Sequence, residues 1–188
     1  IDRDTKKFLD NGCDLVFNAT VNGKTTENYL DTREYGDVMI SLRPPADEWE
    51  IAWRKNNKIH PLVNDWTFFG VGVVVEDCER ATEYFLNLGF SLSKDVYEHH
   101  DLGVKFSSVE VGSMNFEFIE ATADSSVYQE YFNKRGEGIA DMSFIVKDGK
   151  SETDSLISKG AALLISTNDY SLLDTRKEGN MIIRLSKE

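Results

Sequence analysis

The chain has 188 residues and 40% hydrophobic side chains, enough for one or two small domains, each with a buried core. Its net charge of −12 and the lack of a basic stripe exclude nucleic acid as an expected partner. With no apolar run of about 18 residues and only two cysteines, we expect neither a membrane span nor a disulfide framework, and we expect a cytoplasmic protein.

The first 42 residues predict a helix followed by three strands. The helix covers residues 1–12 and ends at Gly12. Asn22-Gly23 is a strong hairpin signal, and a second turn is expected at Gly36. The strands are expected at 14–21, 29–32 and 37–42.

Residues 44–66 read as a linker between modules. The segment is polar and holds all three prolines and all three tryptophans. Trp49, Ile51 and Trp53 alternate as in a strand, so part of the segment is expected to pack on a sheet or on a neighbouring subunit. A homodimer is therefore expected.

Residues 68–89 predict a strand, a tight turn and an amphipathic helix. Three valines alternate with smaller residues before Asp77, a good N-cap residue. Ala81, Tyr84, Phe85 and Leu88 then form one apolar helical stripe. Gly89 follows, where helices often end in a left-handed conformation.

The rest of the chain predicts the same types of element. Ser151 with Asp154 forms a weak capping box for the second of two helices. The expected helices are 125–133 and 151–159, and the expected strands are 91–98, 104–111, 115–121, 139–146, 161–167, 170–175 and 180–185.

An internal repeat organises these elements. Residues 144–148 (FIVKD) match 73–77 (VVVED), and Gly160 matches Gly89. Residues 30–42 also parallel 173–185, with LDTR at the start of both stretches. Each complete module is a strand, a helix and three strands (βαβββ), and the first module lacks its opening strand, so the chain is expected to begin inside a module.

The repeat predicts an α+β fold of tandem βαβββ modules. We expect a partial first module at 1–43 and a linker at 44–66. A domain of two paired modules is expected at 67–188, with a second module at 67–122 and a third at 138–187. We further expect the linker or a second subunit to supply the strand that the first module lacks.

This tandem repeat resembles the vicinal oxygen chelate superfamily of glyoxalase I, bleomycin-resistance proteins, extradiol dioxygenases and methylmalonyl-CoA epimerase. The likeness is greatest to the epimerase-like branch, on residues 115–146 and on the LDT…G pattern near the end of two modules. It covers residues 68–186 fully and 5–42 in part. The resemblance implies a cup-shaped mixed sheet.

In that family, the first and last strands of each module supply the ligands of a divalent metal. The matching positions here are Gly70, Glu117, Asp141 and Arg184, where the family usually has His, Glu or Gln, His and Glu. Glycine offers no ligand and arginine is always cationic, so the resemblance implies a degenerate, metal-free site with no cofactor. Carboxylates with Mg²⁺ remain an alternative.

Strand alternation independently places these residues on one face. Glu117 lies between Phe116 and Phe118, while Asp141 and Arg184 also alternate with apolar neighbours. An arginine beside two acids suits a small ligand with a carboxylate or phosphate, or else forms an ion-pair network that replaces the metal.

Three functions remain open from the sequence. The first is a small-molecule binding protein for sequestration or sensing, or the non-catalytic half of a longer enzyme. The second is an epimerase-, lyase- or glyoxalase-like enzyme acting next to the carbonyl of a small acid or thioester, with Glu117 or Asp141 as base and Arg184 as clamp. The third is an interaction module. His99 and His100 are expected to point to opposite faces and to lie in a surface turn.

Overall fold

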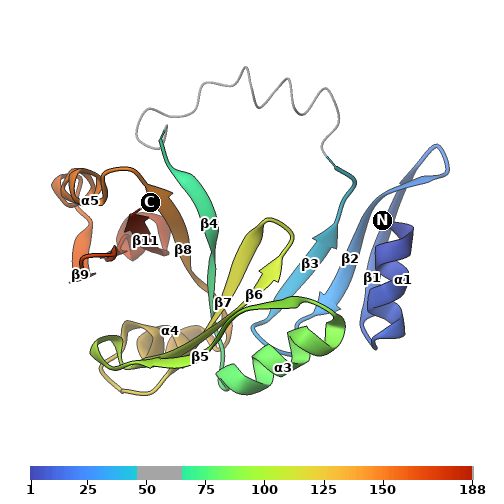
Figure 1. Ribbon diagram of the computed structural model, residues 1–188, viewed down its shortest axis with the longest axis horizontal. Helices are drawn as coiled ribbons and strands as arrows, with labels where there is room; N and C mark the ends of the chain where they lie inside the picture. Colours follow the sequence, from blue (N-terminus) through green and yellow to red (C-terminus); the bar gives the residue numbers. More distant parts are fainter. Residues whose placement is uncertain (46–64, 188) are drawn as a thin grey trace.

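The computed structural model describes residues 1–45 and 65–187, and Figure 1 shows their arrangement. The first module has one helix and three strands, close to the expected bounds: α1 Asp2–Asp10, β1 Asp14–Val21, β2 Lys24–Thr32 and β3 Val38–Leu42. The hairpin prediction is confirmed, because Asn22 and Gly23 have φ values of 52° and 75°. β2 starts earlier than expected because it pairs with β1 up to this turn.

The second and third modules repeat the order strand, helix and three strands. The second comprises β4 Thr67–Val74, α3 Cys78–Leu88, β5 Ser91–His99, β6 Val104–Val111 and β7 Met114–Ala121. The short helices η2 His100–Leu102 and α4 Val127–Arg135 follow β5 and β7. The third comprises β8 Gly138–Val146, α5 Gly149–Ser158, β9 Ala162–Ser166, β10 Tyr170–Asp174, α6 Arg176–Gly179 and β11 Ile182–Lys187.

These two modules form one sheet of eight strands in the order β5-β6-β7-β4-β8-β11-β10-β9. The second half of this order mirrors the first, and the two opening strands, β4 and β8, pair antiparallel at the centre. One side-chain contact crosses the cup: the Tyr170 hydroxyl of β10 lies 2.6 Å from Nε2 of His99 on the edge strand β5. The prediction of an α+β, cup-shaped mixed sheet is confirmed.

The two faces of the large sheet bury different residues. Val71 and Val73 pack with Phe85 of α3 and with Phe116 and Phe118 of β7 on the outer face. The inner face of the cup is filled by a second cluster that joins both halves of the sheet and is closed by α4; it includes Val74, Phe106, Ile119, Tyr128, Leu172 and Ile182. Alternation on β4 and β7 therefore sorts the residues as predicted.

The first module forms its own three-stranded sheet, β1-β2-β3, beside α3 (Figure 1). Val38 and Ile40 of β3 join the outer core that surrounds Val73. Glu137 holds the junction, because its carboxylate accepts from the backbone N–H groups of Gly36 and Glu76. The first module is thus attached through both core packing and charged hydrogen bonds.

The missing first strand is only partly addressed by the structure. Within residues 1–45 and 65–187, β3 pairs with β2 and with no other strand. Trp49 and Trp53 lie outside the described residues, so the expectation that the linker supplies a strand stays a prediction. Trp66, the last residue of that linker, packs on Phe144 with ring centroids 5.2 Å apart. The proposed division at 1–43, 44–66 and 67–188 also stays a prediction.

Helix capping was predicted correctly for α3 and wrongly for α5. Asp77 accepts a hydrogen bond from the Arg80 N–H, and Gly89 ends α3 with a φ of 98°. In α5 the cap is Asp148, which accepts from the Ser151 N–H, so the predicted Ser151 capping box is wrong. The internal repeat already aligned Asp148 with Asp77. Asp148, a good N-cap residue, caps α5 in place of Ser151. No helix in the described part of the chain is long and apolar enough to cross a membrane.

Candidate functional site

The four positions that match the family's metal ligands lie in two adjacent rows of the central strands. In one row, Gly70 of β4 pairs with Ser143 of β8, which pairs in turn with Arg184 of β11. In the next row, Glu117 of β7, Gly72 and Asp141 pair in the same way. Because β4 carries glycines in both rows, no side chain on that strand stands between Arg184 and Glu117.

Arg184 uses this space to reach Glu117. Its Nη2 forms an ion pair with the Glu117 carboxylate, and its Nε and Nη2 donate to Ser143 Oγ at 3.0 and 2.7 Å. The side chains of Arg184 and Glu117 are 13% and 14% exposed. We call these three residues the Arg184 network. It joins two of the four family ligand positions, Arg184 and Glu117, by an ion pair.

Burial lowers the pKa of Arg184 to about 10. The guanidinium is still cationic at neutral pH, and the adjoining Glu117 carboxylate favours that charged form. The remaining terminal nitrogen, Nη1, donates to no described residue and is not among the buried polar atoms that lack a partner. Arg184 therefore keeps donor capacity for a ligand oxygen.

Gly70 cannot be exchanged for a ligating residue without moving the backbone. A Cβ built on Gly70 would lie only 2.1 Å from the carbonyl oxygen of Asn115 on β7. The glycine thus permits a close approach of two strands, which a histidine at this position would prevent.

The residues present do not fit a divalent metal. Gly70 has no donor and no room for one, and Arg184 brings a positive charge that repels a cation. No group of three or more His, Cys, Asp or Glu side chains in the described residues is arranged to hold a metal ion. The metal chemistry of the fold family therefore has no ligand set here.

Asp141 is separated from the Arg184 network and is fully buried, with 0% exposure. Its Oδ2 accepts a hydrogen bond of 2.7 Å from the Tyr128 hydroxyl. Burial raises the pKa of Asp141 to about 6, although the Tyr128 hydroxyl and the nearby Gly72 N–H lower it in part. Burial and the facing carboxylate also raise the pKa of Tyr128 well above its usual value.

Gly72 makes room for this buried carboxyl group. A Cβ on Gly72 would lie 2.3 to 2.4 Å from the carboxyl atoms of Asp141. The two glycines of β4 therefore have separate roles: Gly70 allows strand approach, and Gly72 leaves the space that Asp141 occupies.

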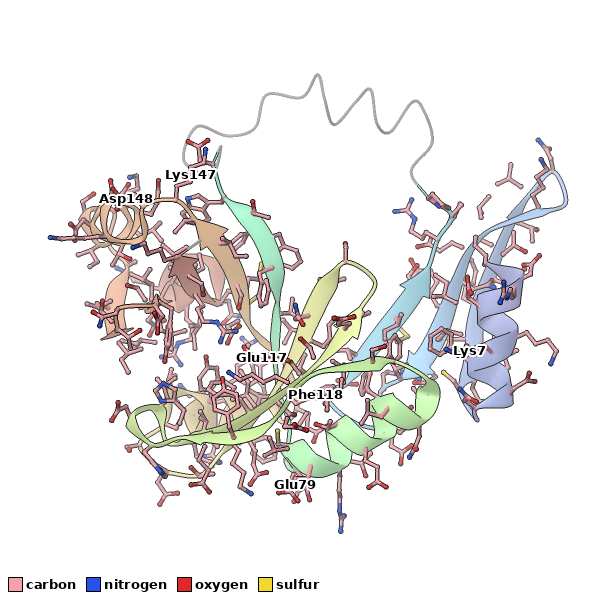
Figure 2. The ribbon with its side chains drawn as sticks, viewed as in Figure 1. Lys7, Glu79, Glu117, Phe118, Lys147 and Asp148 are labelled. Carbon is pink, nitrogen blue, oxygen red and sulfur yellow. The ribbon has the colours of Figure 1, made fainter. Side chains whose placement is uncertain are left out.

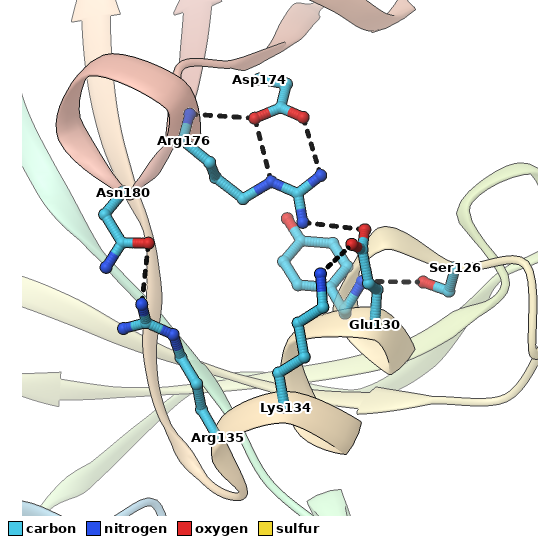
Figure 3. A network of polar contacts seen from close by, with 8 residues as sticks. Ser126, Glu130, Lys134, Arg135, Asp174, Arg176 and Asn180 are labelled. Atoms are coloured by element: carbon cyan, nitrogen blue, oxygen red, sulfur yellow. Dashed lines mark hydrogen bonds and ion pairs between the residues drawn. The ribbon is translucent and has the colours of Figure 1, made fainter.

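A polar network fixes the helix that carries Tyr128 (Figure 3). Arg176 binds Asp174 through two hydrogen bonds of 2.9 and 2.7 Å and reaches Glu130 of α4 at 3.0 Å. These carboxylates raise the pKa of Arg176. Arg135 of α4 donates to Asn180 at 2.9 Å, so both ends of α4 are tied to the third module.

Aromatic and imidazole groups make the contact that crosses the cup between β5 and β10. His99 stacks edge-on against Phe106 and Tyr170, and its Nε2 shares a hydrogen bond with the Tyr170 hydroxyl. His100 points the other way and lies 3.6 Å from Glu98, with 87% of its side chain exposed. His99 ends β5 and His100 begins η2, so the expectation of opposite strand faces does not apply; the placement of His99 in a plain surface turn is wrong because it bonds to Tyr170.

The structure thus brings together Glu117 and Arg184, leaves Asp141 beneath them and adds two residues that sequence analysis did not assign to the site. Ser143 stands two residues after Asp141 on β8 and was given no role by the sequence analysis. Tyr128 lies in the helix expected at 125–133, and only the three-dimensional contact reveals its bond to Asp141. A tyrosine near a repeat junction carries no sequence signal for such a partner.

Solved structures with a similar fold include methylmalonyl-CoA epimerases. The enzyme from Mycobacterium tuberculosis is 23% identical, with 71% of this chain and 94% of that chain covered and a TM-score of 0.58. A Streptomyces coelicolor methylmalonyl-CoA epimerase in complex with 2-nitronate-propionyl-CoA is 16% identical, with coverages of 65% and 94% and a TM-score of 0.56. A hypothetical protein from Bacillus halodurans C-125 is 18% identical, with coverages of 65% and 94% and a TM-score of 0.55. At these identities the likeness shows the fold alone.

No curated protein sequence matches the chain significantly. A family model does match, over residues 70–172, which is more than half of the chain, and its description is Glyoxalase/Bleomycin resistance protein/Dioxygenase superfamily. The matched region contains three of the four family ligand positions, Gly70, Glu117 and Asp141. The mirrored order of the eight-stranded sheet agrees with this match. The chain therefore belongs to the glyoxalase/bleomycin resistance protein/dioxygenase superfamily.

Proposed function

We propose that the chain is a metal-independent small-molecule binding protein that takes a carboxylate- or phosphate-bearing ligand at Arg184. The observation that carries this proposal is the guanidinium at one of the family ligand positions, which is held by Glu117 and Ser143 and whose Nη1 donates to no described residue. A planar guanidinium binds carboxylate or phosphate oxygens in a defined geometry. Sequestration, sensing or service as the non-catalytic half of a longer enzyme would each use such a site.

Glu117 sets the selectivity of this site in our proposal. It already neutralises Arg184, so a simple anion gains little by approaching the pair, whereas a ligand with an added hydroxyl or amino group can satisfy both partners. The ligand class is therefore a small hydroxy or amino acid, or a phosphate ester with hydroxyl groups.

A ligand panel tests the proposal directly. Calorimetric titration of wild type with malonate, lactate, serine and glycerol phosphate should find at least one binder whose affinity is unchanged by EDTA. Arg184→Gln should weaken that binder about tenfold or more, and Arg184→Lys should restore part of the affinity. Equal binding by wild type and Arg184→Gln, or loss of binding with EDTA, would contradict the proposal.

Asp141 supports a second candidate, an enzyme that moves a proton next to a carbonyl group. A carboxyl group with a pKa of about 6 is suited to proton transfer near neutral pH, and methylmalonyl-CoA epimerases share the fold. Its complete burial stands against direct access by a substrate. Deuterium incorporation at the α-carbon of methylmalonyl-CoA or of small acids would support this alternative, provided that Asp141→Asn abolishes it.

A further inference from the structure

A cavity of about 630 Å³ lies between α5 and the outer face of the third module. Its walls include Thr153 and Ile157 of α5, together with Leu163, Ser171 and Leu185 of the three strands below. Leu185 alternates with Arg184 along β11, so this cavity lies on the opposite face of the sheet from the Arg184 network. We call it the α5 cavity.

The second module shows how the same interface looks when it is closed. Thr82 stands seven residues before Gly89, and Ser107 of β6 pairs with Phe118 of β7. Thr82 Oγ1 lies 2.5 Å from Ser107 Oγ and donates to the Cys78 carbonyl at 2.7 Å. Helix and sheet are thus joined by a buried polar contact.

The third module has the same two residues but leaves them apart. Thr153 stands seven residues before Gly160, and Ser171 pairs with Leu185 as Ser107 pairs with Phe118. The Thr153 side chain is 5% exposed, yet its hydroxyl has no hydrogen-bond partner among the described residues. The Ser171 hydroxyl instead lies 3.3 Å from Ser166 Oγ. A buried hydroxyl without a hydrogen-bond partner is unfavourable unless a ligand or water satisfies it.

Smaller side chains explain why the third module stays open. The two helices start in the same register, since Asp148 caps α5 as Asp77 caps α3. At three equivalent positions, the third module has the smaller side chain. Gly149 replaces Cys78, Leu156 replaces Phe85 and Leu185 replaces Phe118. Gly149 and Leu185 line the α5 cavity, and Leu156 belongs to the buried cluster that includes Leu185.

Three lysines line the α5 cavity, and three aspartates line it as well. Lys147, Lys150 and Lys187 lie at the end where β8 passes into α5, and Figure 2 shows Lys147 and Asp148 there. Asp148 is engaged as the helix cap, and the first turn of α5 adds its own partial positive charge. Asp154 and Asp169 also line the cavity, so the lysines compete with nearby acids. Lys147 also lies 4.0 Å from Asp65.

We propose that the α5 cavity is a second ligand site, which binds a small amphipathic anion with its apolar body against Leu163 and Leu185 and its charged group near the lysines. The unpaired Thr153 hydroxyl hydrogen-bonds to the ligand. Pockets of this volume with an apolar floor and a few polar groups are typical of small-molecule sites. The site is separate from the Arg184 network, so the proposal for either site can be contradicted without affecting the other.

The probe for this site is 8-anilinonaphthalene-1-sulfonate, an apolar anion whose fluorescence rises on binding. Wild type should bind it at one saturable site per chain. Refilling the cavity with the residues of the second module, in Gly149→Cys/Leu156→Phe/Leu185→Phe, should abolish binding. A Cβ on Gly149 meets only ordinary contacts, so the cysteine fits. Thr153→Val should weaken binding about three- to tenfold.

The neutral probe N-phenyl-1-naphthylamine separates charge from apolar burial. Lys150→Gln/Lys187→Gln should weaken the anionic probe about tenfold and leave the neutral one unchanged. Both lysines are exposed, so this variant keeps the fold even if the triple variant does not, and far-ultraviolet circular dichroism checks both. Three results would overturn the proposal: no saturable binding by wild type, full binding by a folded triple variant, or equal effects of the lysine substitutions on the two probes.

Discussion

Thr82 of α3 and Thr153 of α5 occupy equivalent positions, but within the described residues only Thr82 hydrogen-bonds to the sheet beneath its helix. Substituting each of them tests this difference. Thr82→Val removes hydrogen bonds to Ser107 and to the Cys78 carbonyl, so we expect a loss of about 1–2 kcal/mol in the free energy of unfolding. Thr153→Val removes a hydroxyl that has no partner in the described residues, so its effect should lie within about 0.5 kcal/mol or be stabilising.

Urea unfolding of both variants provides the measurement, and each serves as the control for the other because the helix position and the substitution are the same. If Thr153→Val costs as much as Thr82→Val, Thr153 makes a hydrogen bond that the account lacks.

Asp141 should make stability depend on pH between about 4 and 6. The unfolded carboxyl group ionises near pH 3.9, whereas burial raises the pKa of folded Asp141 to about 6. Because the pKa is raised in the folded state, the stability that protonated Asp141 contributes is fully present below pH 4. It is lost as pH rises through 6, and the free energy of unfolding falls by on the order of 3 kcal/mol.

The difference in unfolding free energy between wild type and Asp141→Asn isolates this effect from the other carboxylates. In parallel denaturation curves, the unfolding free energy of the variant should rise relative to that of wild type as pH increases from 4 to 7. A difference that stays constant over this range would show that Asp141 titrates normally.

At the scale of elements, a tight turn holds the first module against the large sheet. Gly36 has a φ of 83°, and a Cβ there would lie 2.5 Å from Val73 Cγ1. Gly36→Ala should therefore combine backbone strain with a clash and cost about 2–4 kcal/mol.

Gly12→Ala is the matched control for Gly36→Ala. Its φ is 91°, but a Cβ at Gly12 meets nothing within 4 Å, so only the strain of about 1–2 kcal/mol applies. Thermal unfolding compares the two. Equal losses would mean that the turn at Gly36 does not press on Val73.

The elements themselves were largely predictable, since they follow from local patterns. Alternation in 68–75, the Asp77 cap and Gly89 fixed one strand and one helix, and the repeat carried the same unit to 144–160. The short helix α6 Arg176–Gly179 was missed because four residues hold no periodicity. The α5 cap was missed because the Ser151 pattern was preferred over the alignment with Asp77.

For the candidate site, the sequence predicted only the strand face on which each residue lies. Alternation placed Glu117, Asp141 and Arg184 on inner faces, but it gave no distance between them. The bond from Tyr128 to Asp141 joins a helix to a strand, and the contact of His99 with Tyr170 crosses the cup from β5 to β10. Such contacts depend on how far the sheet curls, which no local pattern encodes.

At the scale of the whole molecule, β1 is an edge strand with apolar residues on its surface. Val16 and Phe17 are 49% and 54% exposed, and exposed apolar edges favour association between chains. We expect a homodimer whose contact includes β1. Light scattering should give about twice the chain mass of 21.3 kDa, and Val16→Lys/Phe17→Lys should give the monomer. A monomeric wild type would contradict this expectation.

The central claim is that Arg184 has taken the place of a metal in a glyoxalase fold. The most direct test is metal quantification by inductively coupled plasma mass spectrometry on wild type purified without chelators. The account predicts no stoichiometric zinc, nickel, cobalt, iron or manganese, because Gly70 and Arg184 leave no ligand set. About one equivalent of such a metal per chain, retained on dialysis and lost in Glu117→Gln, would contradict it.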